Sequence, residues 1–148
     1  TPVRAAKAML DLTAGYHLDA NELMQKAIFS HTGSSMVIVR DIEFYSLCEH
    51  HILPFFGRVT VGYIPDGKIV GLSKLPRVVD AFARRLQVQE NLTAIPTKGV
   101  IVACTAEHLC MQMRGVEKQQ SETTTIEYTG TFATDPALRA EFRSLAGL

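Results

Sequence analysis

The chain has 148 residues, of which 47% are hydrophobic and 20% are charged, and its formal net charge is zero. This length and composition predict one soluble globular domain with a substantial core. The charge balance excludes a general basic field for nucleic acid or membranes, so any anion site must be local. No apolar run approaches the roughly 20 residues that a helix needs to cross a bilayer.

The cysteines indicate the compartment. Three is an odd number, and two of the three lie close to histidines in the sequence. This pattern favours a reducing compartment and metal binding over a disulfide framework. We therefore expect a cytoplasmic protein, with residues 1–148 forming a single domain.

The N-terminal part of the chain predicts two helices. Thr1 and Pro2 suit the N-cap and the first position of a helix that ends at Gly15. Asp19 opens a capping-box variant that begins a short second helix through Ile28. A polar loop follows before the first strand.

The middle of the chain predicts strands. The β-branched and aromatic run at 36–47 indicates a buried strand that delivers Cys48 at its end. Residues 58–64 alternate polar and apolar side chains, which is typical of a half-buried strand. The turn at 65–68 then predicts that residues 69–72 pair back onto that strand as a hairpin.

Two helix signals follow. Ser73 caps a helix whose apolar residues recur at helical spacing through Leu86. Residues 87–93 predict the start of a second helix, which stops abruptly at the segment 94–99.

The C-terminal third predicts two strands and a helix. Residues 100–113 form one strand in which alternate side chains share a face, namely those of His108, Cys110, Gln112 and Arg114. Cys104, in the apolar part of this strand, is interpreted as a small buried hydrophobe. Residues 121–128 form a further strand, and Asp135 caps a final helix through Leu145.

Two short motifs carry soft metal ligands, Cys48-Glu-His-His51 and His108-Leu-Cys110. Cys48 and His51 are three residues apart, a spacing that two ligands of one metal can use, and Cys110 supplies a third from a distant strand. One more histidine would close a structural zinc site, whereas three ligands leave an open position for water. We favour three ligands, with His50 and His108 as free imidazoles for acid–base chemistry.

Several residues could hold an anion, namely Arg4, Lys7, Ser73, Lys74, Arg77 and Arg114. Arginine suits bidentate phosphate binding, and lysine acts as a point charge. Two of the cations lie in the first turn of a helix, where the macrodipole disfavours them, so either a bound anion or solvent must compensate. The pair Gln89-Glu90 offers a carboxylate that could accept the N1–H and 2-amino hydrogens of guanine, although a solvated helix start is the plainer interpretation.

Together these motifs resemble those of GTP cyclohydrolase I. The matching segments run in unbroken order along nearly the whole chain: Thr-Pro-x-Arg4-x-x-Lys7, Cys48-Glu-His-His51, Gly71-Leu-Ser-Lys74-Leu-x-Arg77, Arg85-Leu-Gln-Val-Gln-Glu90, His108-x-Cys110, Met113-Arg114-Gly115-Val116 and Ser121-x-Thr123-x-Thr125. So many ordered matches make the resemblance highly specific.

The resemblance implies zinc-dependent hydrolysis of GTP to 7,8-dihydroneopterin triphosphate with release of formate, the first step toward folate or biopterin cofactors. By match, the zinc ligands are Cys48, His51 and Cys110, and the catalytic histidines are His50 and His108. Glu90, helped by Gln89, corresponds to the guanine-reading group. The ribose and triphosphate contacts correspond to Ser73, Lys74, Arg77 and Arg114, with Arg4 and Lys7 contributing at least partly from a neighbouring subunit.

The same resemblance implies the tunnelling fold (T-fold), an α+β arrangement of antiparallel strands with helices packed on one side. Such subunits assemble into barrels as a homodecamer, with active sites between subunits. The chain departs from the family pattern in two places. The sequence begins at the Thr-Pro motif, without the helices that usually precede it, and the second helix stops soon after Thr93. Either that helix is shortened or part of it is missing from this sequence, and the abrupt stop favours the second.

Other functions stay open on sequence grounds. A structural-zinc binding module of the same fold, without ring-closing activity, would use four protein ligands. The nitrile reductase of queuosine synthesis shares the fold but lacks this pair of motifs and needs NADPH. A family variant could open the GTP ring without forming the pterin, and the same ligands can hold iron or manganese.

Overall fold

The computed structural model describes residues 1–93 and 99–148. Its main sheet has the strand order β5-β2-β3-β6-β7, and two short strands, β1 and β4, pair separately. The four long strands are antiparallel, and β5 joins β2 in parallel. The strands are β1 (Ile28–Ser30), β2 (Val37–Cys48), β3 (Pro54–Tyr63), β4 (Lys68–Val70), β5 (Leu86–Gln87), β6 (Val100–His108) and β7 (Thr123–Tyr128).

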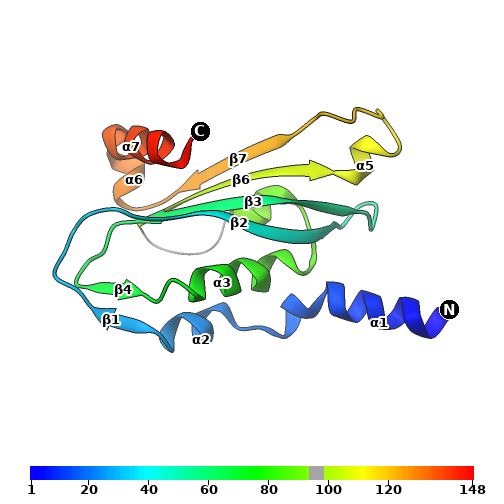
Figure 1. Cartoon of the computed structure of the whole chain (residues 1–148), viewed down its shortest axis with the longest axis horizontal. Helices are drawn as coiled ribbons and strands as arrows, with labels where there is room; N and C mark the ends of the chain where they lie inside the picture. The colour runs from blue at the N-terminus through cyan, green and yellow to red at the C-terminus, as the bar shows by residue number, and fades with distance from the viewer. Residues whose placement is uncertain (94–98) are drawn as a thin grey trace.

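Helices flank this sheet (Figure 1). The N-terminal helices and α3 lie on one side, as predicted, and the short C-terminal helices cover one end of the opposite face. The helices are α1 (Pro2–Leu12), η1 (Ala14–His17, a 3-10 helix), α2 (Ala20–Gln25), α3 (Lys74–Ala83), α4 (Gln89–Thr93), α5 (Leu109–Gln112), α6 (Thr131–Thr134) and α7 (Pro136–Ala146). The α+β class is thus confirmed, and the arrangement is consistent with the T-fold.

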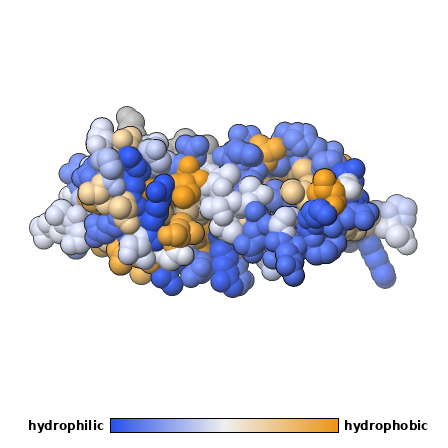
Figure 2. Space-filling model, turned by 90° about the horizontal axis from the view of Figure 1, so that it is seen from above, coloured by the Kyte–Doolittle hydropathy of each residue, from blue (hydrophilic) through white to orange (hydrophobic). Residues whose placement is uncertain are grey.

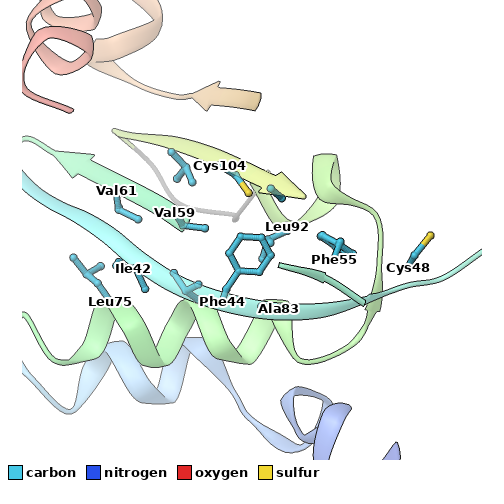
Figure 3. Close-up of a cluster of buried hydrophobic side chains, with 13 residues drawn as sticks. Ile42, Phe44, Cys48, Phe55, Val59, Val61, Leu75, Ala83, Leu92 and Cys104 are labelled. Carbon is cyan, nitrogen blue, oxygen red and sulfur yellow. The ribbon is translucent and has the colours of Figure 1, made fainter. Parts of the chain in front are cut away.

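The larger core lies between the sheet and α3 (Figure 3). Phe44 and Val59 of the sheet belong to one buried cluster with Leu75 of α3, and all three are at most 7% exposed. Burying each side chain of this size contributes about 1.5–3 kcal/mol. A smaller core on the other face joins Ile101 of β6 to Phe142 of α7. The sheet is therefore apolar on both faces where helices cover it.

The outer surface is more hydrophilic than this interior (Figure 2). Seen from above, the molecule is elongated, and hydrophilic residues dominate this face, with hydrophobic ones in small separate groups (Figure 2). None of the helices in the described residues combines the length and apolarity that a bilayer-spanning helix requires.

Two predicted helix ends are wrong. The first helix stops at Leu12, before Gly15, because Gly15 is used elsewhere: its N–H donates to the Arg84 carbonyl at the end of α3 (2.9 Å). A Cβ at Gly15 would lie 2.7 Å from that same oxygen, so only glycine fits this approach. The second helix ends before Ile28, because Ile28 pairs with Val70 in the β1–β4 ribbon.

The predicted hairpin is also wrong. Residues of β4 pair with β1, not with β3. The reason is topological, since β3 lies between β2 and β6 and both of its edges are already hydrogen-bonded. The helix after Ser73 likewise ends at Ala83, and Leu86 belongs to β5, whose residues Leu86 and Gln87 pair with Leu47 and Cys48. The next helix therefore starts at Gln89, and the expectation for its end, at 94–98, lies outside the described residues.

Two predicted strands need correction. The strand at 36–47 is not buried throughout: residues 37–39 are half-buried, residues 40 and 41 are exposed, and burial then alternates as far as Tyr45. Only its last residues through Cys48 are buried without interruption. The strand predicted at 100–113 ends at His108, which pairs with Phe55. The next position on β3 is Pro54, which has no N–H to continue the ladder, so the chain turns into α5. The final helix is as predicted, with the Asp135 carboxylate accepting from two backbone N–H groups of its first turn.

Gly57→Ala is expected to destabilise the sheet by about 3 kcal/mol, because an added methyl group overpacks it. The new Cβ would fall on the Thr105 carbonyl oxygen and lie 2.7 Å from the Ala106 Cα on the paired strand. Urea unfolding measures the loss. Gly67→Ala is the control, since its Cβ meets no atom within 4 Å but its φ is 71°. It should lose only about 1–2 kcal/mol from backbone strain, and an equal loss in both variants would contradict the close approach.

Candidate functional site

Three ligand types converge where β2 ends. After Cys48 the chain reverses through a tight turn, closed by hydrogen bonds from Ile52 N–H to the Cys48 carbonyl and from Cys48 N–H to the Leu53 carbonyl (both 2.8 Å). This turn places His51 Nδ1 3.5 Å from Cys48 Sγ. Cys110 comes from α5, and one ligand atom from each of Cys48, His51 and Cys110 lies within 4.8 Å of the others. These three residues could hold a metal ion.

Cys110 lies in the predicted cluster, but it is carried there by a helix and not by the predicted strand. Strand alternation was expected to carry His108, Cys110 and Arg114 onto one face, but β6 has ended by then. The first turn of α5 brings Cys110 to the cluster instead. Gln112, the fourth residue of the expected face, is buried and donates to Glu107 (2.8 Å).

The donor set suits zinc. Zinc in proteins takes thiolate sulfur at about 2.3 Å and imidazole nitrogen at about 2.0–2.1 Å, usually in a tetrahedron. Two thiols and one imidazole already lie close enough for small side-chain movements to reach that geometry. Burial, with a smaller contribution from neighbouring Cys48, raises the pKa of the Cys110 thiol. A thiol must lose its proton to bind a metal ion. Metal binding by these two cysteines would therefore release protons to the solvent.

Cys104 has a different environment, as predicted. Its side chain lies inside the larger core, whereas Cys48 lies at the core's edge (Figure 3). Burial raises the pKa of the Cys104 thiol to about 12, against weaker hydrogen bonds to Thr93 and Thr125 that lower it. Cys104 therefore behaves as a buried hydrophobe.

His108, the candidate fourth ligand, is held outside the cluster. Its Nε2 lies 2.7 Å from Gln89 Oε1, and its ring stacks on Phe55 with centroids 4.7 Å apart and planes 2° apart. Burial lowers the pKa of His108, and the nearby Glu90 carboxylate acts in the opposite direction. Among the described residues, the ligand cluster thus has three members, and His108 is a separate imidazole beside it.

The two residues Gln89 and Glu90, which follow β5, have different environments. Glu90 is exposed and close enough to His108 to act on it electrostatically. Gln89 was expected to help bind a ligand, but its side chain is buried inside the protein. It is 2% exposed, and its amide hydrogen-bonds to His108, β6 and β7. Within this pair, only Glu90 faces solvent.

Two further predicted residues lie beside the cluster. Arg114 Nη1 is 3.4 Å from His51 Nε2, on the side of the ring away from Cys48. His50 is exposed, and its Nε2 lies 3.7 Å from the Glu49 carboxylate. The structure therefore keeps Arg114 and His50 next to the cluster of Cys48, His51 and Cys110 and open to solvent.

The other candidate anion-binding residues are not at the cluster in a single chain. Ser73, Lys74 and Arg77 lie at the start of α3, beside β4, whereas Cys48 adjoins the far end of that helix through β5 (Figure 1). Ten residues of helix span about 15 Å. Arg4 and Lys7 are exposed on α1, which lies below the body of the molecule in Figure 1.

Sequence reasoning missed the contacts of two residues that shape the site, although Thr125 stood in one of the matching segments. Phe55 supports the His108 ring, and Thr125 bonds the Gln89 amide (3.2 Å). Phe55 had one available signal, since it is the first aromatic residue after the Cys48 motif in a run of apolar residues. The Thr125 contact had none, because it joins residues 36 positions apart.

Comparisons with known proteins found a matching family model and similar relatives. A family model described as GTP cyclohydrolase I matches residues 1–147. A protein of Chlorobium chlorochromatii named GTP cyclohydrolase 1 is 56% identical over 154 residues, covering 98% of this chain and 69% of its own length. Proteins with the same name from Chlorobaculum tepidum (53% identity, 99% of this chain, 70% of the relative) and Porphyromonas gingivalis (55%, 99% and 80%) are also similar.

Proposed function

Since the chain belongs to the GTP cyclohydrolase I family, we propose that it hydrolyses GTP to 7,8-dihydroneopterin triphosphate and formate. The observation that carries this proposal is the convergence of Cys48, His51 and Cys110, with His108 held beside them rather than among them. Three protein ligands leave a coordination position open, which a catalytic zinc needs and a structural zinc lacks. This favours an enzyme over a structural-zinc binding module.

Each residue at this end of the molecule has a proposed task. Cys48, His51 and Cys110 hold the zinc ion, which when bound supplies a Lewis acid that lowers the pKa of a water toward neutrality. His108 enters the reaction as a neutral imidazole, because burial lowers its pKa, and transfers protons to and from the guanine ring. His50 is open to solvent next to His51 and would assist later proton transfers in ring closure.

Glu90 is proposed to read the guanine base. Its exposed carboxylate lies near His108, where the reacting ring must come, and it can accept the N1–H and 2-amino hydrogens of guanine. Arg114, on the other side of His51, would bind ribose or phosphate oxygens. Base and phosphate would thus lie on either side of the metal.

The remaining candidate anion-binding residues are proposed to act across a subunit boundary. Ser73, Lys74 and Arg77 lie at the opposite end of α3 from Cys48, so a second copy of the chain would bring its own set to the triphosphate. Every residue of α1 is exposed, including Val3 (67%) and Leu10 (65%), which supports burial of this helix in a homo-oligomer. Arg4 and Lys7 on α1 would then reach a neighbour's site, and the family decamer is the assembly we propose.

Incubation of the zinc-loaded protein with GTP tests the function. We expect stoichiometric formate and a product that becomes a fluorescent pterin on oxidation, with neither from ATP, which lacks the 2-amino group that Glu90 would read. Formate without fluorescence would identify a ring-opening variant that stops before the pterin. Absence of both from protein with one zinc per chain would contradict the proposal.

Zinc binding to the metal-free protein is expected to tighten as the pH rises from about 6 to about 8, by up to about tenfold per pH unit for each thiol that must ionise. The Cys110 thiol, whose pKa is raised above its ordinary value, is protonated throughout this range in the metal-free protein and must release its proton when zinc binds. Titration calorimetry in buffers of different ionisation enthalpy counts the released protons. Cys104→Ser should leave that count unchanged, and affinity independent of pH would contradict thiolate ligation.

A further inference from the structure

Gln89 is a buried polar side chain at a junction of three elements. It is the first residue of α4 and is 2% exposed. Its Nε2 lies 2.8 Å from the Thr123 carbonyl oxygen, 3.1 Å from the Cys104 carbonyl oxygen and 3.2 Å from Thr125 Oγ1. Its Oε1 lies 2.7 Å from His108 Nε2. Both ends of the amide are thus engaged with the protein.

These contacts determine which way the amide points. A backbone carbonyl only accepts hydrogen bonds, so the amide atom facing Thr123 and Cys104 must be the NH2 group. The atom facing His108 is therefore the amide oxygen, which also only accepts. It follows that His108 Nε2 carries a hydrogen and donates it to Gln89.

This assignment decides the tautomer of His108. A neutral imidazole has one N–H, so a hydrogen on Nε2 leaves Nδ1 with the lone pair. The Phe55 ring, 0% exposed and 2° from parallel, holds the plane of the imidazole. Phe55 and Gln89 together hold both the ring plane and its rotation within that plane.

We infer that Gln89 is a positioning residue for His108, which holds the imidazole as the Nε2–H tautomer and makes Nδ1 the nitrogen that exchanges protons with the substrate. This inference rests on the proposed function for its catalytic meaning. In the transfer, Nδ1 accepts the proton that the attacking water loses and passes it to the purine-ring nitrogen whose bond to C8 breaks, while the Nε2–H bond to Gln89 stays intact. The task differs from guanine reading, which needs an amide free to meet a ligand.

The tautomer can be measured without any catalysis. Solid-state 15N spectra of protein labelled in its histidines, at pH 8 and without metal, distinguish protonated from bare ring nitrogens, and His108→Asn identifies the signals of His108. We expect a protonated Nε2 and a bare Nδ1. In Gln89→Met, which is similar in size but has neither an amide N–H nor an amide oxygen, this preference should be lost. A wild-type His108 protonated on Nδ1 would overturn the inference, whatever the activity.

Kinetics separate positioning from guanine reading. Gln89→Met should lower kcat by about 100-fold through a misplaced acid–base group and leave the KM for GTP within about twofold. A guanine reader would instead show a raised KM. Gln87→Met, the same substitution two residues earlier on β5, is the matched control and should retain wild-type kcat.

A double mutant tests whether Gln89 acts through His108. Once His108→Asn has removed the imidazole, adding Gln89→Met should cost no more than about a further twofold in kcat. A full additional loss would show that Gln89 matters for the fold alone. Failure of the wild-type protein to release formate would refute the proposed function but not the tautomer, which the spectra report independently.

Discussion

Cys110→Ser is expected to abolish zinc binding and formate release together. Serine's hydroxyl does not ionise near neutral pH and is a harder ligand than a thiolate, so only Cys48 and His51 would remain, too few for a catalytic zinc site. The metal contributes several kcal/mol of charge stabilisation in the transition state, which corresponds to a loss of about 10³-fold or more in kcat. Zinc content by atomic absorption and formate by an enzymatic assay are measured on the same sample.

The fold should survive this change, because Cys110 is only partly buried and lies in a single turn of helix. Cys104→Ser is the matched control, since it makes the same substitution in the core, away from the metal ligands. It should keep one zinc per chain and near-normal turnover, at a cost of about 1–3 kcal/mol for a buried hydroxyl. Full formate release by a zinc-free Cys110→Ser protein would rule out the metal site.

Phe55→Ala is expected to lower the free energy of unfolding by about 3–5 kcal/mol, among the largest effects of any single core truncation. The ring is 0% exposed and packs edge-on against Phe44, with centroids 5.9 Å apart. In a chain of this length the loss lowers the midpoint of thermal unfolding by about 10 °C, measured on metal-free protein at fixed concentration. The variant should also lose turnover, because His108 stacks on the same ring.

The neighbouring residue provides the control. Phe56 lies on the opposite face of β3, is partly exposed and stacks on exposed Tyr45 at 6.0 Å. Phe56→Ala removes the same number of atoms but should cost only about 1–2 kcal/mol and leave the His108 ring in place. Equal losses in the two variants would mean that the Phe55 side of the sheet is not the main core.

The local parts of the fold were predictable. Asp135 caps α7 because its carboxylate meets N–H groups two and three residues ahead, and that contact needs nothing distant. The end of β2 at Cys48 and the return of His51 beneath it likewise lie within one turn of chain. Metal-binding residue types at such spacing indicated the cluster before any fold was known.

Pairing partners were not predictable in the same way. From their residue types alone, the residues of β4 could have paired with β3 or with another strand. Only the complete sheet shows that both edges of β3 are already hydrogen-bonded, to β2 and β6. The strand that begins at Val100 could have continued through Cys110. On its partner strand β3, however, the residue after Phe55 in the pairing is Pro54, which has no N–H to extend the ladder. Each outcome depends on which backbone groups remain free once distant strands have met.

The sequence by itself therefore determined the family and pointed to the three residues that could hold a metal ion and to the charged residues proposed for a nucleotide, because residue type and short spacing carry that information. Only the tertiary structure decided that Cys110 arrives on a helix, that Ser73 and Lys74 lie at the far end of α3 from Cys48, and that Gln89 hydrogen-bonds to His108. The physical reason is that a buried amide bonds to whatever acceptors and donors the assembled strands present. For Gln89 these come from positions 15 to 36 residues away along the chain.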